Sequence, residues 1–137
     1  MNTLHAVLQR LHNPDLGMLF IRLALGAAFI HAGWLKLMNM DMTVGFFGIL
    51  GIPVWLAYVV AYSEFLGGIA MVLGIFTRYA GIVLAAIMIV ATLVVHLPKG
   101  FGLQGGGYEY TLVLLLAALS AVTLGSGKYS LAQLIKR

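Results

Sequence analysis

The stretch AYSEFLGGIAMVLGI places one carboxylate, that of Glu64, in the middle of an apolar run. An earlier run contains two cations, Arg22 and Lys36, and two later runs carry His96 and Glu109 near their ends. A carboxylate or an imidazole can accept a proton or a hydrogen bond from a ligand, and an ammonium group can pair with a carboxylate. These side chains are the candidates for chemistry, and their role depends on the solvent around them.

The composition indicates a membrane protein. The 137 residues are 62% hydrophobic and 9% charged, and the mean hydropathy is +1.04. Soluble domains are about half apolar and about a quarter charged, so this chain has too few charges to cover a surface in water. The absence of cysteine excludes disulfides and thiolate metal ligands within the chain. The length predicts a single domain, residues 1–137.

Four apolar runs have the ~20 residues that a helix needs to cross a bilayer. We predict transmembrane helices at approximately 17–38, 54–75, 79–97 and 108–125, packed as an all-α four-helix bundle. Near the N-terminus Leu4, Leu8 and Leu11 share one helical face while Arg10 and His12 lie elsewhere, and the C-terminal stretch YSLAQLIKR has a similar pattern. This pattern predicts short helices at the N- and C-termini that lie in the membrane interface.

The charges outside the runs predict the orientation of the bundle. The side that contains the termini carries Arg10, Arg78, Lys128, Lys136 and Arg137. The other side carries Lys36 and Lys99. The positive-inside rule therefore predicts that both termini lie in the cytoplasm. The expected anionic partner of a chain with a net charge of +4 is the lipid headgroups rather than nucleic acid. Arg22 and Arg78 are predicted to anchor the bundle by extending to the inner headgroups.

Helical spacing predicts that each span has one face on which polar groups and small residues combine, and small residues allow helices to approach closely. The glycines expected to pack these faces are Gly26, Gly33, Gly68 and Gly81. On the fourth span the predicted inward face comprises Glu109, Val113, Leu116, Ser120 and Thr123. His31 lies about half a turn away from the polar face of its helix, so it is predicted to meet a different neighbour, a second subunit or the outer headgroups.

Side-chain direction predicts an ion pair inside the bundle. Helical side chains lean toward the N-terminus, so Lys36 leans into the membrane while Glu64 leans toward Lys36. Lys36 with Glu64 is the preferred pair, and Lys36 with Glu109 is the alternative. Ionisable residues within membranes are usually functional or paired, so Glu64 is either a proton- or ligand-binding group or half of a structural pair. Glu109 has a structural explanation too, because the helix dipole favours an acid in the first turn.

Several fragments, in this order and spacing, resemble the DoxX family of small four-helix membrane proteins. They are RLALGAAFIHAGWLKL, LGIP, EFLGGIAMVLGIFTR, GGGYEYTLVLL and LGSGKYSL, within about residues 15–130. The resemblance implies a multi-pass protein of a bacterial or archaeal inner membrane. Some members are associated with quinone-linked oxidoreductases, and others are membrane partners of soluble redox or detoxification proteins. The family motif positions are Arg22, Gly26, Gly33, Lys36, Glu64, Gly67, Gly74, Arg78 and Glu109.

The main functional hypothesis is a subunit or anchor of a quinone-linked oxidoreductase system. A cavity in the outer half of the bundle would bind the lipid-soluble ligand. The candidate proton or hydrogen-bond acceptors are Glu64, Glu109, His31 and His96. The candidate contacts for the ligand ring are Trp34, Tyr58, Tyr62 and Phe65. The alternative is a non-catalytic bundle that carries a small hydrophobic molecule or scaffolds membrane-protein assembly. A proton-coupled transporter is less favoured because no inverted repeat is found. Whether the chain is itself an enzyme stays open.

The expected cofactors and partners are few. No metal site is predicted because His and acidic residues lack close ligand spacing. Haem is disfavoured because His31 and His96 differ in depth by roughly 9 Å at 1.5 Å per residue. The chain itself carries no cofactor motif, so a quinone is the one cofactor considered. Besides the lipid bilayer, the expected partners are a soluble or membrane redox protein and, through the small-residue faces, a second copy of the chain.

Overall fold

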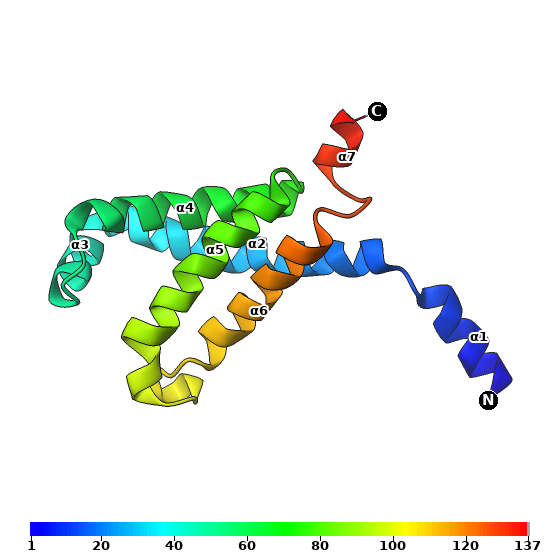
Figure 1. Ribbon diagram of the computed structural model, residues 1–137, viewed down its shortest axis with the longest axis horizontal. Coiled ribbons are helices and arrows are strands. Elements are labelled where there is room, and N and C mark those ends of the chain that lie inside the picture. The colour runs from blue at the N-terminus through cyan, green and yellow to red at the C-terminus, as the bar shows by residue number, and fades with distance from the viewer. Residues whose placement is uncertain (137) are drawn as a thin grey trace.

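The computed structural model describes residues 1–136, and the regular secondary structure of that part of the chain is all helical, without strands (Figure 1). The α-helices are α1 (Asn2–Leu11), α2 (Pro14–Met38), α3 (Met40–Ile49), α4 (Val54–Leu73), α5 (Thr77–Ala91), α6 (Glu109–Leu124) and α7 (Leu131–Ile135). A π-helical turn, η1 (Thr92–His96), and a 3₁₀ turn, η2 (Leu97–Lys99), continue α5, and a second 3₁₀ turn, η3 (Leu103–Gly105), precedes α6. Arg137, one of the basic residues used to predict the orientation, lies outside the described residues.

Three of these helical stretches are long and apolar enough to cross a membrane. They are α2, α4 and the continuous stretch Thr77–Lys99, which joins α5 to η1 and η2. The apolar helices α3 and α6 are shorter, with 10 and 16 residues. At 1.5 Å per residue α6 is about 24 Å long, slightly less than a hydrocarbon core of about 30 Å. The described residues thus provide three to four apolar helices that are compatible with a membrane bundle.

The four predicted spans leave residues 39–53 outside any helix, so α3 is not among the predicted helices. In the structure Asn39 ends α2 and at once begins α3. Its side-chain amide donates to the Leu35 carbonyl in the last turn of α2, and Thr43 Oγ1 in α3 donates to the Asn39 carbonyl. The chain therefore bends at Asn39 without leaving helical structure, and α3 covers one end of the bundle (Figure 1).

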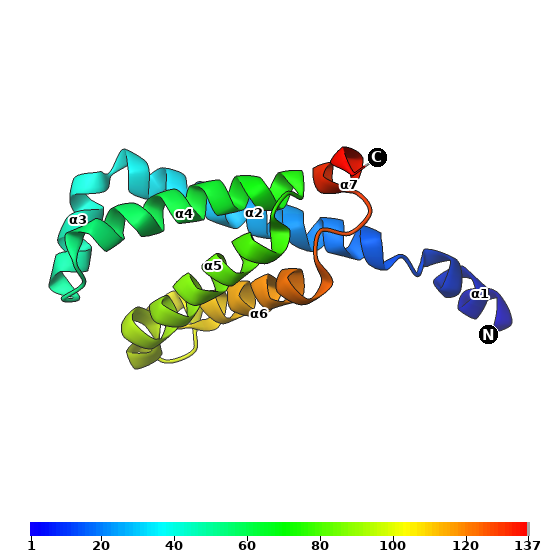
Figure 2. The same cartoon turned by 45° about the horizontal axis from the view of Figure 1, so that its top comes forward.

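The four long helices form two side-by-side pairs, α2 with α4 and α5 with α6, in both orientations drawn (Figures 1 and 2). The pairs meet at the short turn between α4 and α5, where Gly74 and Phe76 both adopt left-handed backbone conformations. From this turn α5 diverges from α4 toward the end occupied by α3 (Figure 1). The bundle is therefore narrow at the end near both termini and wide at the end near α3.

The glycines predicted to pack the helices lie at their closest contacts. A Cβ atom on Gly33 would lie 2.8 Å from the Phe65 Cα atom, and one on Gly68 would lie 2.7 Å from the Ile30 backbone nitrogen. Between α5 and α6, a Cβ atom on Gly81 would lie 3.1 Å from the Ala118 carbonyl oxygen. Any side chain at Gly33 or Gly68 would push α2 away from α4, so these positions fix the spacing of that pair.

The inward face predicted for the fourth span is wrong. Val113 and Leu116 are 60% and 56% exposed, whereas the buried residues of α6 are Thr111, Ala118 and Ala121. Ser120 Oγ donates to the Leu116 carbonyl, and Thr123 Oγ1 donates to the Leu119 carbonyl. Hydroxyls that are satisfied by their own helix need no partner across the bundle, so they can face lipid. The core between the two pairs is formed by Leu25, Phe29, Met71, Leu84, Ala118 and Ala121.

Candidate functional site

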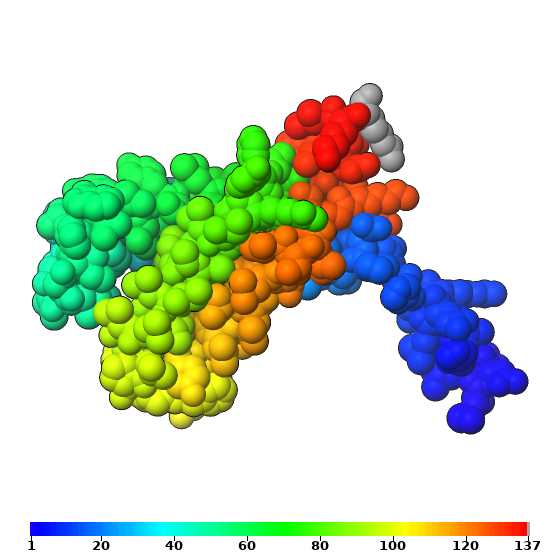
Figure 3. All heavy atoms as spheres, in the orientation of Figure 1, coloured from blue at the N-terminus to red at the C-terminus, as the bar shows by residue number. Residues whose placement is uncertain are grey.

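The wide end of the bundle contains a cavity of about 800 Å³. Residues from α2, α3, α4, α5, η1 and α6 line it, and most of them are apolar. The outline of the molecule is indented between α3 and the far end of α5 (Figure 3). Ile82, Val83 and Val90 line the cavity and are 55%, 44% and 51% exposed, so the cavity also opens on the flank of the bundle.

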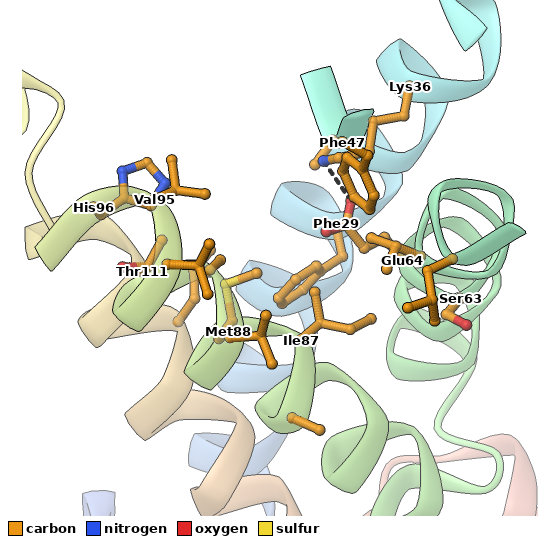
Figure 4. Close-up of a pocket in the computed structure, with 18 of the residues that line it drawn as sticks. Phe29, Lys36, Phe47, Ser63, Glu64, Ile87, Met88, Val95, His96 and Thr111 are labelled. Atoms are coloured by element: carbon orange, nitrogen blue, oxygen red, sulfur yellow. Dashed lines mark hydrogen bonds and ion pairs between the residues drawn. The ribbon is translucent and has the colours of Figure 1, made fainter. Parts of the chain in front are cut away.

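An ion pair lies in one wall of this cavity (Figure 4). Lys36 Nζ, in the last turn of α2, is 2.8 Å from Glu64 Oε2, in the middle of α4. The Glu64 side chain is 3% exposed and that of Lys36 is 30% exposed. Because Lys36 binds one carboxylate oxygen, the second oxygen of Glu64 can still accept a hydrogen bond. The structure thus contains the preferred ion pair, and among residues 1–136 Lys36 pairs with Glu64 and not with Glu109.

The opposite wall carries a second polar group, His96 (Figure 4). His96 ends the π-helical turn η1, and its Nδ1 atom is 2.7 Å from the Gly106 carbonyl oxygen. One turn earlier, Thr92 Oγ1 donates to Thr111 Oγ1 at 2.9 Å, and Thr111 Oγ1 donates to the Tyr108 carbonyl. These bonds attach η1 to the first turn of α6 through Thr111 and to the preceding loop through Gly106, so the imidazole lies on a segment held from two sides.

Two of the candidate acceptors lie outside the cavity. His31 is exposed on α2, and Glu109 lies in the first turn of α6; neither side chain lines the cavity. Four predicted ring contacts, Trp34, Tyr58, Tyr62 and Phe65, do not line it either. The aromatic residues that do are Phe29, Phe46, Phe47 and Tyr110. Phe46 and Phe47 were missed because they belong to α3.

The prediction that Arg22 extends to the lipid headgroups is wrong. Arg22 is fully buried, and its guanidinium donates to the Met71 carbonyl at 3.1 Å and to the Tyr129 carbonyl. The last carbonyls of a helix lack partners within the helix, so the C-terminal turn of α4 offers acceptors for a buried cation. Gly74 leaves the space: a Cβ atom there would lie 3.0 Å from Arg22 Cζ. Arg78, the other predicted anchor, is exposed at the start of α5.

Among the described residues, no three His, Asp or Glu side chains come close enough together to hold a metal ion. The polar groups of the cavity are instead an ammonium–carboxylate pair, a second ammonium, an imidazole and hydroxyls, contributed by Lys36, Ser63, Glu64, His96, Lys99, Tyr110 and Thr111. Such groups bind organic ligands through hydrogen bonds. The arrangement is a mostly apolar chamber with polar groups on opposite walls.

Comparison with known proteins agrees with this architecture. The sequence profile of the DoxX family matches residues 17–97. The chain is similar to a protein of Bacillus subtilis (strain 168) named "Putative oxidoreductase CatD", with 34% identity over 112 residues, 82% of this chain and 81% of that protein. It is also similar to the "Inner membrane protein YqjF" of Escherichia coli (strain K12), with 26% identity over 123 residues, 90% of this chain and 95% of that protein.

A third relative, an uncharacterized protein of Haemophilus influenzae (strain ATCC 51907 / DSM 11121 / KW20 / Rd), is 31% identical over 75 residues, 55% of this chain and 50% of its own length. No solved structure matches the chain. The family match covers more than half of the sequence, including both residues of the ion pair. Together with the apolar helices and the inner-membrane relative, it identifies this chain as a member of the DoxX family and a multi-pass protein of the bacterial inner membrane.

Proposed function

We propose that this chain is a subunit or anchor of a quinone-linked oxidoreductase system and that it binds the lipid-soluble ligand in the cavity between its helix pairs. The observation that carries the proposal is the Lys36–Glu64 pair, with its buried carboxylate, in the wall of an apolar cavity of about 800 Å³. Ligand sites typically enclose about 300–1,000 Å³ and combine an apolar lining with a few placed polar groups. The cavity has both properties.

The ion pair offers the hydrogen bonds that a quinone ring requires. The Lys36 ammonium can donate to a ring carbonyl, and the free oxygen of Glu64 can accept from a ring hydroxyl. The oxidised ring has the carbonyl groups, and the reduced ring has the hydroxyl groups. The surrounding apolar side chains would contact the faces of the ring, and a hydrophobic tail would extend through the opening on the flank into the lipid. Ile82 and Val83 lie at that opening.

The role of subunit or anchor follows from the chemistry of the chain. It has no cysteine, so it offers no thiol for electron transfer. A bound quinone would therefore exchange electrons with a partner protein, while the chain binds and orients the ring. The oxidoreductase name of the Bacillus subtilis relative supports a redox system. The inner-membrane name of the Escherichia coli relative supports the location in the bilayer.

We extend the proposal to topology: α2, α4, α5 with η1, and α6 each cross the membrane, and both termini lie in the cytoplasm. The termini and the turn between α4 and α5 lie at one end of the bundle, whereas α3 and η3 lie at the other (Figure 1). The first end carries Arg10, Arg78, Lys128 and Lys136, and the second carries Lys36 and Lys99. This distribution supports a cytoplasmic location for the first end. In that orientation the cavity, at the second end, lies in the outer half of the proposed bundle.

The decisive experiment is mass spectrometry of the organic extract from protein purified in mild detergent. Glu64→Gln is the test variant, and Glu109→Gln is the matched control because Glu109 does not line the cavity. We expect near-stoichiometric quinone in the wild type and in Glu109→Gln, and its loss from folded Glu64→Gln. Retention of quinone by Glu64→Gln would refute the assigned site. A different hydrophobic compound in all three samples would favour the alternative function, a non-catalytic carrier.

A further inference from the structure

The hydrogen bond of His96 determines which ligand groups its other nitrogen can bind. A carbonyl oxygen has no proton to donate, so the Nδ1 atom, 2.7 Å from the Gly106 oxygen, carries the hydrogen of that bond. In a neutral imidazole only one nitrogen is protonated, and Nε2 then keeps its lone pair. The second nitrogen of His96 is therefore a hydrogen-bond acceptor.

This acceptor lies across the cavity from Glu64. Both residues line the cavity, and Figure 4 shows them on opposite sides of it, with Met88 and Ile87 between. Glu64 belongs to the α2–α4 pair, whereas His96 belongs to the turn that ends α5. Each helix pair therefore contributes an acceptor without a hydrogen of its own, the Glu64 carboxylate on one and the imidazole nitrogen of His96 on the other, and apolar side chains lie between them.

The backbone around His96 holds the imidazole in place. In the π-helical turn η1 the chain gains one residue relative to the α-helical register, which turns His96 away from the direction it would have in a continued α5. Gly106, its partner, has a positive φ of 77° and closes the turn that follows η3. The bond thus joins two irregular segments across ten residues, and such π-turns are frequent at functional sites.

We infer that the cavity selects the reduced, dihydroxy form of an aromatic ring, a hydroquinone, which donates one hydroxyl to Glu64 and the other to His96 Nε2. The inference rests on the proposed function and adds its redox preference and its second binding residue. The oxidised ring has carbonyls at both ends, so it can accept from Lys36 but offers no hydrogen to His96. At the His96 end the two forms therefore differ by one hydrogen bond.

The cations of the cavity can donate to the ring oxygens of either form, so the preference comes from the acceptors. Lys36 donates to Glu64, so the first wall provides a donor and an acceptor side by side. Lys99 also lines the cavity, and its aliphatic carbons lie against Gly106: a Cβ atom there would be 3.2 Å from Lys99 Cδ. Its ammonium can donate to a ring oxygen at the His96 end, whether that oxygen is a carbonyl or a hydroxyl, so only the bond to His96 Nε2 distinguishes the two forms there. One net hydrogen bond corresponds to about a three- to tenfold difference in affinity.

The test is binding of decylubiquinol and decylubiquinone to the full chain in mild detergent under argon, measured by calorimetric titration. His96→Phe removes the acceptor, and His31→Phe is the matched control because His31 is exposed and does not line the cavity. We expect the wild type to bind the quinol about three- to tenfold more tightly than the quinone. His96→Phe should lose that preference through weaker quinol binding, while His31→Phe should keep it.

A ligand series keeps the inference testable if His96→Phe fails to fold. The two monomethyl ethers of decylubiquinol each lack one of the two donors. Both should bind the wild type more weakly than decylubiquinol, because one acceptor is unpaired in either complex. If one ether binds as tightly as the quinol, only one hydroxyl is recognised and the inference is wrong. Equal affinity of the wild type for quinol and quinone would overturn it as well.

The outcomes also separate this inference from the proposed function. If the wild type binds both redox forms equally, the cavity is a quinone site without the assigned preference, and only the inference fails. If it binds neither form and the organic extract contains no quinone, the proposed function fails with it. A uniform loss of affinity for both forms in His96→Phe would assign His96 a purely structural role.

Discussion

Replacing Lys36 with methionine would separate a structural contribution of the ion pair from a functional one. Methionine replaces the aliphatic part of the lysine side chain with an unbranched apolar one and removes the charge, so the packing along α2 changes little. Glu64 is then left as a carboxylate with 3% exposure and no ammonium partner. Removing one partner of a buried pair is strongly destabilising, because the remaining charge is desolvated without compensation.

The two single substitutions should have unequal effects because the partners are buried unequally. Lys36→Met strands the 3% exposed carboxylate, and we expect a loss of about 3 kcal/mol of unfolding free energy. Glu64→Gln strands an ammonium that is 30% exposed and near the end of its helix, so we expect a loss of about 1 kcal/mol. In the double variant neither charge remains, and we expect a loss of about 2 kcal/mol rather than the additive value of about 4.

The assay is reversible unfolding of the four proteins by SDS from mixed micelles, followed by far-ultraviolet circular dichroism. The quantity of interest is the coupling energy, about 2 kcal/mol in our estimate, which exceeds the ~0.6 kcal/mol average of polar contacts between membrane helices. Lys99→Met serves as a control, since Lys99 is exposed and its ammonium has no ion-pair partner among the described residues. Additive losses, or a larger loss for Glu64→Gln than for Lys36→Met, would refute the reasoning from burial.

Two further predictions concern the cation at the narrow end and the topology. Arg22→Met should lower the unfolding free energy by about 1–3 kcal/mol for each carbonyl it leaves unpaired. The exposed Arg78→Met should cost much less in the same SDS titration, and equal losses would contradict the buried role of Arg22. Because the chain has no cysteine, single substitutions can report its orientation. In right-side-out spheroplasts a membrane-impermeant maleimide should label Gln104→Cys but not Gln133→Cys, and the reverse pattern would invert the proposed topology.

The inward faces of the first three spans could be predicted from the sequence because small residues and polar groups repeat there with the helical period. Glu64 and Gly68 are both buried on α4, and Gly81 is buried on α5. The same combination of small and polar residues gave the wrong face on α6, because the prediction there followed the polar residues and not the small ones. Ala118 and Ala121 lie in the core, and the hydroxyl-bearing Ser120 does not. In a membrane, close helix contact depends on small side chains, so alanine was the better signal.

The features that the sequence did not reveal depend on contacts between distant segments. Arg22 is buried because the carbonyls of Met71 and Tyr129 converge on it, 49 and 107 residues away along the chain. No periodicity encodes that convergence, and an isolated arginine near a span end is ordinarily explained by snorkelling. The position of His96 depends likewise on a π-helical turn and on Gly106. Hydropathy detects neither, because the apolar run continues through η1 without interruption.

The position of the cavity follows from an asymmetry between the two ends of the bundle. At the narrow end a short turn joins α4 to α5, and Arg22 ties α2 to the end of α4 and to the segment before α7. At the wide end longer connections, with α3 on one side and η2 and η3 on the other, leave the helix pairs apart. The glycine contacts hold α2 against α4, so the divergence occurs between pairs rather than within them. Lys36 and Glu64 belong to one tightly packed pair, and their geometry is fixed before any ligand enters. A ligand that also contacts His96 must bridge the two pairs, and its binding would therefore stabilise the wide end of the bundle.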